Sequence, residues 1–205
     1  MSIKLYSWPR STGTRVVWAL EELGVPYEYV ELDRTKGENK TDSYLAINPN
    51  AKVPALVDDG ISYFESTAIF LYLGERYGVE RGLWPAGGQE RADALSWTVW
   101  AQSELLYNIR ELLYHGKDTP ISYKREDRSK AAAEFNEKTV TKHFDMLEKR
   151  LTGRDYITGA FSLVDLAIVT AVHFGTMFGI GLTGHPNVAA WVERCMKRPA
   201  AAKMR

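Results

Sequence analysis

Hydroxyl side chains at two predicted helix starts are the residues of this chain best suited to chemistry. Ser11 and Thr12 stand where an apolar helical pattern opens, and Ser66 opens a second helix directly after Glu65. The free N–H groups and the dipole of a helix N-terminus favour a negative charge, and a hydroxyl adds a donor. Both places can therefore hold an anion. Serine is also a favoured N-cap residue, so a purely structural role stays open at each.

The chemistry around Ser11 is not that of a dithiol. Ser7, Thr14 and Tyr6 lie nearby and are rival hydroxyl donors, but residues 11–14 read Ser-Thr-Gly-Thr. A thioredoxin-type redox protein places a reactive cysteine at this helix start. The single cysteine, Cys195, falls in the last predicted helix, which excludes an intrachain disulfide and fits a cytoplasmic location.

Composition limits the partners. The chain has 205 residues, of which 45% are hydrophobic and 25% are charged, and its formal net charge is zero. This composition is typical of a folded globular protein. The chain carries no net positive charge that would attract nucleic acid or a membrane surface. The first residues lack the pattern of a secretory signal. No metal site is expected, because the histidines show no ligand spacing: His115, His143, His173 and His185.

The first eighty residues alternate short strand patterns with helical ones. The Asp59–Gly60 turn between two apolar runs is a strong hairpin signal. The order strand, helix, strand, then hairpin and helix predicts a mixed four-stranded sheet covered by helices, which is a thioredoxin-like arrangement. The expected strands are 3–6, 27–32, 53–57 and 61–64, the expected helices are 11–23 and 65–77, and a turn is expected at 44–47.

The rest of the chain reads as helical after a linker rich in Gly and Pro at 79–88. Ser162 and Asp165 form the pattern of a capping box. The stretch 163–182 is nearly long enough to cross a bilayer, but Asp165, His173 and several glycines interrupt it, which favours a helix buried inside a helical domain. The expected helices are 89–114, 129–151, 162–178 and 187–197.

Sequence motifs in a fixed order carry a family resemblance over nearly the whole chain. They are Ser11-Thr12-Gly13-Thr14-Arg15-Val16, Asn48-Pro49 with Lys52-Val53-Pro54-Ala55-Leu56, Phe64-Glu65-Ser66-Thr67-Ala68-Ile69, Phe161-Ser162-Leu163-Val164-Asp165, His185-Pro186-Asn187-Val188 and Arg198-Pro199-Ala200. Together they resemble cytosolic glutathione S-transferases of the serine-type classes, phi most nearly and zeta or theta less closely. The resemblance implies an α/β thioredoxin-like glutathione-binding domain at 1–78, a linker at 79–88 and an all-α domain at 89–205.

The resemblance also implies roles for the two hydroxyl sites. Ser11, with Thr12 as the next candidate, would stabilise the thiolate of bound glutathione. A free thiol has a pKa of about 8.5, and lowering it by about two units requires roughly 2.7 kcal/mol of preferential interaction with the anion. Ser66 would bind the γ-glutamyl carboxylate, and Glu65 would help to hold the neighbouring ammonium.

Further implied contacts lie between these two sites. A cis bond before Pro54 would let the backbone of Val53 pair with the cysteinyl part of glutathione. Lys40 and Lys52 would face the glycyl carboxylate, although surface lysines are usually only solvated. The chain departs from the family pattern at two positions: Asn39 replaces a histidine typical of the phi class, and Asn50 replaces an aromatic residue that locks the subunits of several classes.

An apolar second substrate is expected, on the aromatic side chains Trp8, Trp97, Trp100, Tyr107 and Tyr114. Such stripes are more often core than pocket. The predicted function is a cytoplasmic, homodimeric transferase that joins the glutathione thiolate to apolar electrophiles, as in detoxification, with glutathione as co-substrate and no metal. The alternatives are a glutathione-dependent peroxidase or isomerase on the same fold, or a non-catalytic module that binds glutathione or another ligand.

Overall fold

The chain divides into two compact units in the computed structural model, which describes residues 3–204. The first unit contains the residues up to Arg91 together with those from Arg198 onward, and the second is Ala92–Lys197. This division differs from the expected boundaries, which set 79–88 apart as a linker and gave the last residues to the helical domain.

Side-chain contacts explain the difference. The indole of Trp84 donates to Glu75 at 3.1 Å and lies so close to Gly74 that a Cβ there would be 2.5 Å from the ring. At the other end of the chain, the Nε and Nη2 atoms of Arg198 each donate to the Glu22 carboxylate at 2.7 Å. The segment 79–88 and the last residues are therefore tied to the first unit.

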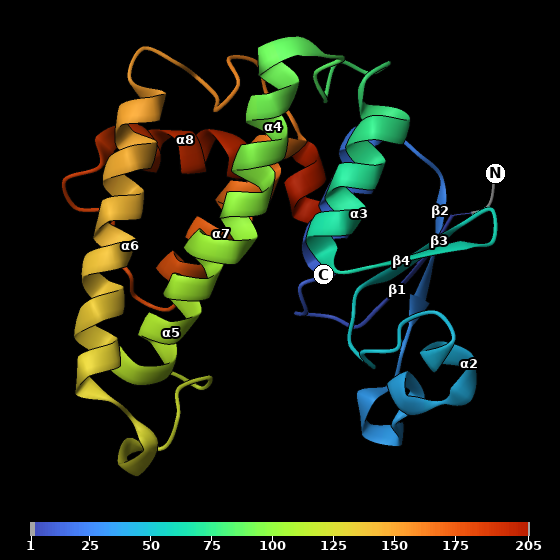
Figure 1. Ribbon diagram of the computed structural model, residues 1–205, viewed down its shortest axis with the longest axis horizontal. Coiled ribbons are helices and arrows are strands. Elements are labelled where there is room, and N and C mark those ends of the chain that lie inside the picture. The colour runs from blue at the N-terminus through green and yellow to red at the C-terminus, as the bar shows by residue number, and fades with distance from the viewer. Residues whose placement is uncertain (1–2, 205) are drawn as a thin grey trace. The chain divides into compact units, whose positions relative to one another are not determined.

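The first unit is built on a mixed four-stranded sheet (Figure 1). The strand order is β2-β1-β3-β4, with β1 parallel to β2 and antiparallel to β3, and β3 antiparallel to β4. This confirms the thioredoxin-like arrangement. The strands are β1 (Ile3–Ser7), β2 (Tyr27–Glu31), β3 (Ala55–Asp58) and β4 (Ile61–Phe64).

The side chains of each strand alternate between the two faces of the sheet, and both faces are covered. Ile3, Leu5 and Ser7 of β1 are fully or almost fully buried on one face, whereas Tyr6 of the same strand packs in a cluster around Tyr44. Helices α1 (Thr14–Leu23) and α3 (Ser66–Leu73) pack against each other. Tyr44 belongs to a short helix, α2 (Asp42–Leu45), where the sequence suggested only a turn.

The regular secondary structure of the second unit is helical, apart from isolated bridges at 156–160. The expected helix 89–114 is a run of α4 (Gly88–Trp100), a π-helical stretch Ala101–Leu106, and α5 (Tyr107–Gly116). The remaining helices are α6 (Lys130–Leu151), α7 (Leu163–Met177) and α8 (Pro186–Met196), and α7 packs against both α5 and α8 (Figure 1).

The buried helix α7 organises the second unit. Most of its residues are buried, as expected for a helix enclosed on all sides, and no helix in residues 3–204 is long and apolar enough to cross a membrane. The predicted capping box at its start is present. Asp165 is fully buried and accepts hydrogen bonds from the backbone of Ser162 and Ile157 and from the indole of Trp191, at 2.8–2.9 Å.

Replacing Asp165 should therefore destabilise the helical unit. Burial raises the pKa of the Asp165 carboxyl, and the donors around it oppose that shift because they bind the ionised form. D165A leaves buried donors without an acceptor, so we expect a loss of about 3 kcal/mol or more in the free energy of unfolding. Urea denaturation measures it.

D155A is the matched control, because its carboxyl is 78% exposed in the same unit and its removal should change stability by less than about 0.5 kcal/mol. Equal losses in the two variants would show that the Asp165 hydrogen bonds do not hold the helix start.

Candidate functional site

Ser11 lies in the loop between β1 and α1. The helix begins at Thr14 with Gly13 as its N-cap, so Ser11 is neither in the first turn, as expected, nor an N-cap residue, which was the structural alternative. The Ser11 Oγ accepts a hydrogen bond from the Gly13 N–H at 3.1 Å and lies 2.9 Å from the Oγ of Ser7. Ser11 is half-buried, which leaves its hydroxyl within reach of a ligand.

The neighbouring hydroxyl of Thr12 already has a partner. It donates to the backbone carbonyl of Val53 at 3.2 Å, across 41 positions of sequence. This bond joins the loop before α1 to the loop before β3. It also distinguishes the two candidates, because the proton of Thr12 points to a backbone acceptor whereas the proton of Ser11 can turn to a ligand.

The loop before β3 is held by buried side chains. The Val53–Pro54 peptide bond is cis, as the family resemblance implied. The carbonyl of Lys52 accepts hydrogen bonds from the Tyr44 hydroxyl at 2.5 Å and from the Asn48 side-chain amide at 2.7 Å. Burial raises the pKa of Tyr44 to about 12, so this phenol stays protonated and keeps donating. The backbone of Val53 is thus fixed before any ligand binds.

Asparagine residues tie the same loop to its neighbours. Asn39 is buried and donates to the carbonyl of Ala51 at 2.6 Å, while its own Oδ1 finds no partner within the described residues. Asn50 donates to the Glu65 carboxylate at 3.2 Å. Both positions depart from the family pattern, and the structure shows that each amide has a defined place in the loop.

Glu65 and Ser66 form the start of α3. Glu65 is the N-cap residue and has φ 67° and ψ 122°, a left-handed conformation that is strained for a residue with a side chain. Ser66 is the first helical residue rather than the N-cap, it is buried, and its hydroxyl has no hydrogen-bond partner in the part of the chain that the structure describes. An unused hydroxyl beside free helical N–H groups is suited to an anion.

The two lysines make weaker candidates than the residues above. Lys40 and Lys52 are both exposed, and neither side chain forms an ion pair within residues 3–204. Because both side chains are exposed, water and salt screen their charges.

The predicted aromatic residues fall into different environments. In the first unit, Trp8 is half-buried and packs against the cluster around Tyr44. In the second unit, Trp97 and Trp100 are edge to face at 5.2 Å. Residues of α6 also contact this pair.

The α6 contacts are specific. Arg150 lies over the Trp97 ring at 5.7 Å, and His143 packs against Trp100 at 5.3 Å. Burial lowers the pKa of His143, which keeps it neutral. Tyr114 packs on Tyr123, whereas Tyr107 is 58% exposed and available to a partner.

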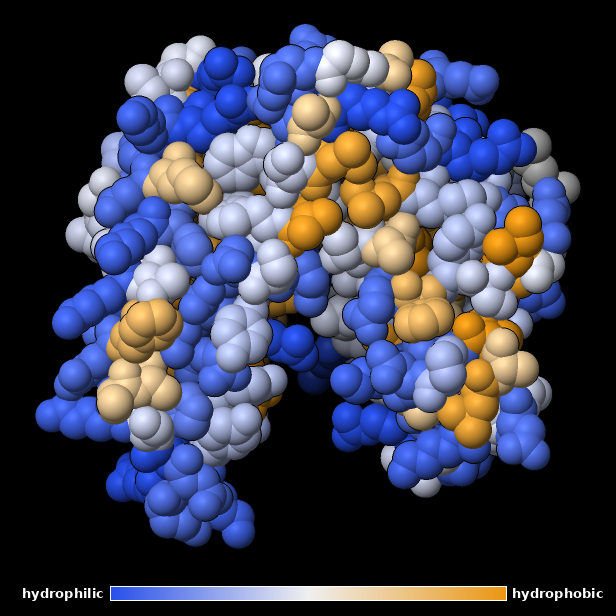
Figure 2. All heavy atoms as spheres, in the orientation of Figure 1, coloured by the Kyte–Doolittle hydropathy of each residue, from blue (hydrophilic) through white to orange (hydrophobic). Residues whose placement is uncertain are grey.

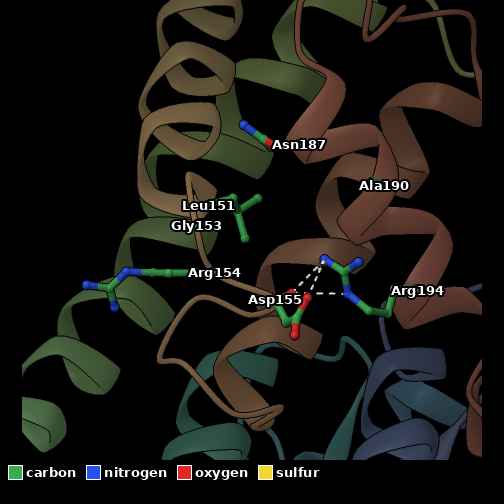
Figure 3. Close-up of a pocket in the computed structure, with 7 residues that line it drawn as sticks. All are labelled: Leu151, Gly153, Arg154, Asp155, Asn187, Ala190 and Arg194. Atoms are coloured by element: carbon green, nitrogen blue, oxygen red, sulfur yellow. Dashed lines mark hydrogen bonds and ion pairs between the residues drawn. The ribbon is translucent and has the colours of Figure 1, made fainter.

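Two cavities of the helical unit are lined by none of the predicted site residues. One of about 290 Å³ is lined by α6, α8 and the turn after α6, and Figure 3 shows the guanidinium of Arg194 directed at Asp155 while Arg154 extends away. The Arg194 guanidinium is therefore engaged by Asp155. No group of His, Cys, Asp or Glu side chains placed to hold a metal ion occurs in residues 3–204.

Comparison with known proteins identifies the family. Residues 1–75 match the glutathione S-transferase N-terminal domain, and residues 112–199 match the C-terminal domain of the same family. The chain belongs to the glutathione S-transferase family. It is 34% identical to the glutathione S-transferase GstB of Escherichia coli over 96% of this chain and 95% of that protein.

Other relatives differ in their described roles. The disulfide-bond oxidoreductase YfcG of E. coli is 31% identical over 98% of this chain and 93% of its own length. The structure of Ure2p in complex with glutathione is 27% identical, with a TM-score of 0.85 over 99% of this chain and 97% of that one. The comparisons thus show the transferase family and fold, and they include proteins with different activities.

Sequence reasoning missed the supporting role of several residues around the site. Tyr44, Asn48 and Asn39 hold the loop before β3, and Ser7 was considered only as a rival donor. The Asn48–Pro49 turn was a usable signal, because an asparagine that opens a turn often bonds its own backbone. Nothing local in the sequence indicated the contacts that Asn39 and Tyr44 make with this loop.

Ser7 and Gly13 should be coupled in packing. A Cβ on Gly13 would lie 1.9 Å from the Oγ and 2.8 Å from the Cβ of Ser7, although the backbone there, φ −69° and ψ −22°, suits alanine. We therefore expect G13A to destabilise the protein by about 1–3 kcal/mol through overpacking. The S7G/G13A double variant should recover most of the loss, as measured by urea denaturation.

The S7G single variant is the control for this pair. If G13A lowers the free energy of unfolding equally with Ser and with Gly at position 7, the two positions are not coupled and the clash is relieved elsewhere.

Proposed function

We propose that the protein is a glutathione transferase that ionises the glutathione thiol beside Ser11 and adds it to apolar electrophiles. The supporting observation is a pair of hydrogen bonds in the first unit. Thr12 bonds the carbonyl of Val53, and Asn50 bonds Glu65. These bonds connect the loop before α1, the loop before β3 and the start of α3, which are the three segments that the family uses for glutathione.

Each part of glutathione then has a matching group. The Ser11 hydroxyl donates to the sulfur, and the Val53 backbone pairs with the cysteinyl backbone as an added strand does. The free N–H groups and the hydroxyl at Ser66 bind the γ-glutamyl carboxylate, and the Glu65 carboxylate accepts from the ammonium. Lys40 and Lys52 add a positive charge near the glycyl carboxylate.

The reaction needs only a nucleophilic sulfur held in place. The bound thiol loses its proton to solvent, and the thiolate is stabilised by the Ser11 hydroxyl and the nearby start of α1. Sulfur then attacks the electrophilic carbon, a carbon–sulfur bond forms, and the leaving group departs with its electron pair. The fully buried Cys195 takes no part in this chemistry.

The second substrate is proposed to be apolar. In the helical unit, the exposed ring of Tyr107 is available for it, whereas Trp97 and Trp100 are engaged by α6. A cytoplasmic location and a role in detoxification complete this proposal and rest on the family resemblance and on the single cysteine.

A non-catalytic role is the second candidate. The nitrogen regulation fragment of the yeast prion protein Ure2p is 27% identical to this chain with a TM-score of 0.85.

A peroxidase or isomerase activity would use the same thiolate on another substrate. Turnover of chlorodinitrobenzene, hydroperoxide and maleylacetoacetate, measured side by side, separates the three reactions, and no turnover of any with intact glutathione binding would favour the non-catalytic role.

Removing the Ser11 hydroxyl should weaken ionisation of the bound thiol. We expect S11A to lower kcat/KM with chlorodinitrobenzene about 100-fold, the order seen when one anion-stabilising donor is lost. The Kd of glutathione, measured by calorimetry below the pKa of the bound thiol, should change little. The ultraviolet absorbance of the thiolate, titrated in the complex, should show its pKa rising towards about 8.5.

T12V is the matched control, because it removes a neighbouring hydroxyl whose proton points to Val53. It should affect glutathione affinity more than thiol ionisation. If T12V abolishes ionisation and S11A does not, Thr12 is the donor and the assignment of Ser11 is wrong.

We propose further that the protein is a homodimer. Large apolar side chains are exposed in each unit: Ile61 and Phe64 on β4, and Leu95 and Val99 one helical turn apart on α4. The face shown in Figure 2 is mostly hydrophilic, with hydrophobic side chains grouped in a few patches. Light scattering should give twice the chain mass, and V99E should lower it. A monomeric mass for the unaltered protein would contradict the dimer.

A further inference from the structure

Ser7 is a polar side chain buried at the end of a strand. It is the last residue of β1, its carbonyl accepts from the Leu32 N–H at 2.9 Å, and it has no solvent exposure. A hydroxyl in such a place must find a partner in the protein. Its Oγ lies 2.9 Å from the Oγ of Ser11 and 3.4 Å from the carbonyl of Trp8, so the contact with Ser11 is the closer one.

The Ser11 hydroxyl has one proton and two lone pairs. One lone pair accepts from the Gly13 N–H at 3.1 Å. When the proton of Ser11 points to a bound sulfur, the second lone pair is free to accept the proton of Ser7. Both acceptor positions of Ser11 are then filled by the protein, and its proton is left for the ligand.

Gly13 provides the room for this arrangement. Its missing side chain leaves space that the Ser7 hydroxyl occupies, since a Cβ there would lie 1.9 Å from the Ser7 Oγ and 3.2 Å from the Ser11 Oγ. Any other residue at position 13 would displace the Ser7 hydroxyl from Ser11. The three residues therefore form one unit, in which a glycine admits a buried hydroxyl that contacts the half-buried one.

We propose that Ser7 is a positioning residue that donates to Ser11 and thereby strengthens the hydrogen bond from Ser11 to the glutathione thiolate. This rests on the proposed function, in which Ser11 is the donor to sulfur. Hydrogen bonds in a chain polarise one another, each strengthening the next by about 10–30%. Without a ligand, Ser11 can instead donate to Ser7, and Ser7 to the carbonyl of Trp8. Binding of the thiolate reverses both hydroxyls, and no proton leaves either serine.

The test is the pKa of the bound thiol in S7A. If the surroundings of Ser11 lower that pKa by about two units, loss of one supporting bond should raise it by about half a unit. Below the pKa this leaves about threefold less thiolate, and kcat with chlorodinitrobenzene falls by the same factor. At high pH, where ionisation is complete in both proteins, the difference in kcat should vanish. KM for glutathione should be unchanged below the pKa of the bound thiol, because Ser7 then faces the neutral form in both proteins.

Two further variants separate positioning from a general effect on the fold. In an S11A background, S7A should cause no additional rise in the thiol pKa, because Ser7 acts only through Ser11. T14V is the matched control: the Thr14 hydroxyl donates at 2.9 Å to the carbonyl of Ser11 rather than to its Oγ, so its loss should leave the thiol pKa unchanged.

S7G/G13A gives a second route to the same measurement if S7A folds poorly. It removes the hydroxyl while filling the space at position 13, and it should reproduce the half-unit rise. A thiol pKa that stays at the wild-type value in both S7A and S7G/G13A, while S11A raises it, would overturn the role of Ser7 and leave the proposed function intact.

Other results have equally definite meanings. If S7A raises the pKa as much in the S11A background as it does with Ser11 in place, Ser7 acts on the fold and not through Ser11, and the proposal is wrong. If S11A itself leaves the thiol pKa unchanged, the proposed function of Ser11 fails, and the role of Ser7 fails with it.

Discussion

The candidate site depends on the backbone carbonyl of Lys52, which accepts hydrogen bonds from the buried side chains of Tyr44 and Asn48. Residues 48–54 belong to no strand or helix, so side chains must satisfy their backbone groups. Because this carbonyl is fixed, the next residue, Val53, presents its own carbonyl to Thr12. The high pKa of Tyr44 ensures that the donor keeps its proton over the whole physiological range.

Local chemistry explains what the sequence predicted well. The strands follow from alternation of apolar residues, and the main helices from helical spacing. The capping box follows from Ser162 and Asp165. Each of these patterns involves residues only a few positions apart. The position of Ser11 was less well predicted. Helix α1 starts later than its apolar pattern suggests, since the glycine at position 13, and not a serine, occupies the N-cap.

Long-range contacts account for what the sequence could not supply. The bond between Thr12 and Val53 spans 41 positions, and the sequence analysis did not predict it. The same holds for Trp97 and Trp100: their helical spacing marks an aromatic stripe, but only tertiary packing shows that α6 residues contact both rings. Asn39 likewise stood out only as a departure from the family pattern until the structure placed it against Ala51.

The groups around Ser11 are sufficient, on energetic grounds, to keep a bound thiol ionised. A hydrogen bond to a charged group contributes about 1.5–3 kcal/mol, and a helix N-terminus about 0.3–1 kcal/mol. Their sum covers the roughly 2.7 kcal/mol that a two-unit fall in the thiol pKa requires. The exposed lysines at 40 and 52 are therefore not needed for ionisation. In the proposed function their charges bind the glycyl carboxylate, while the thiolate depends on hydroxyl and amide groups of the protein.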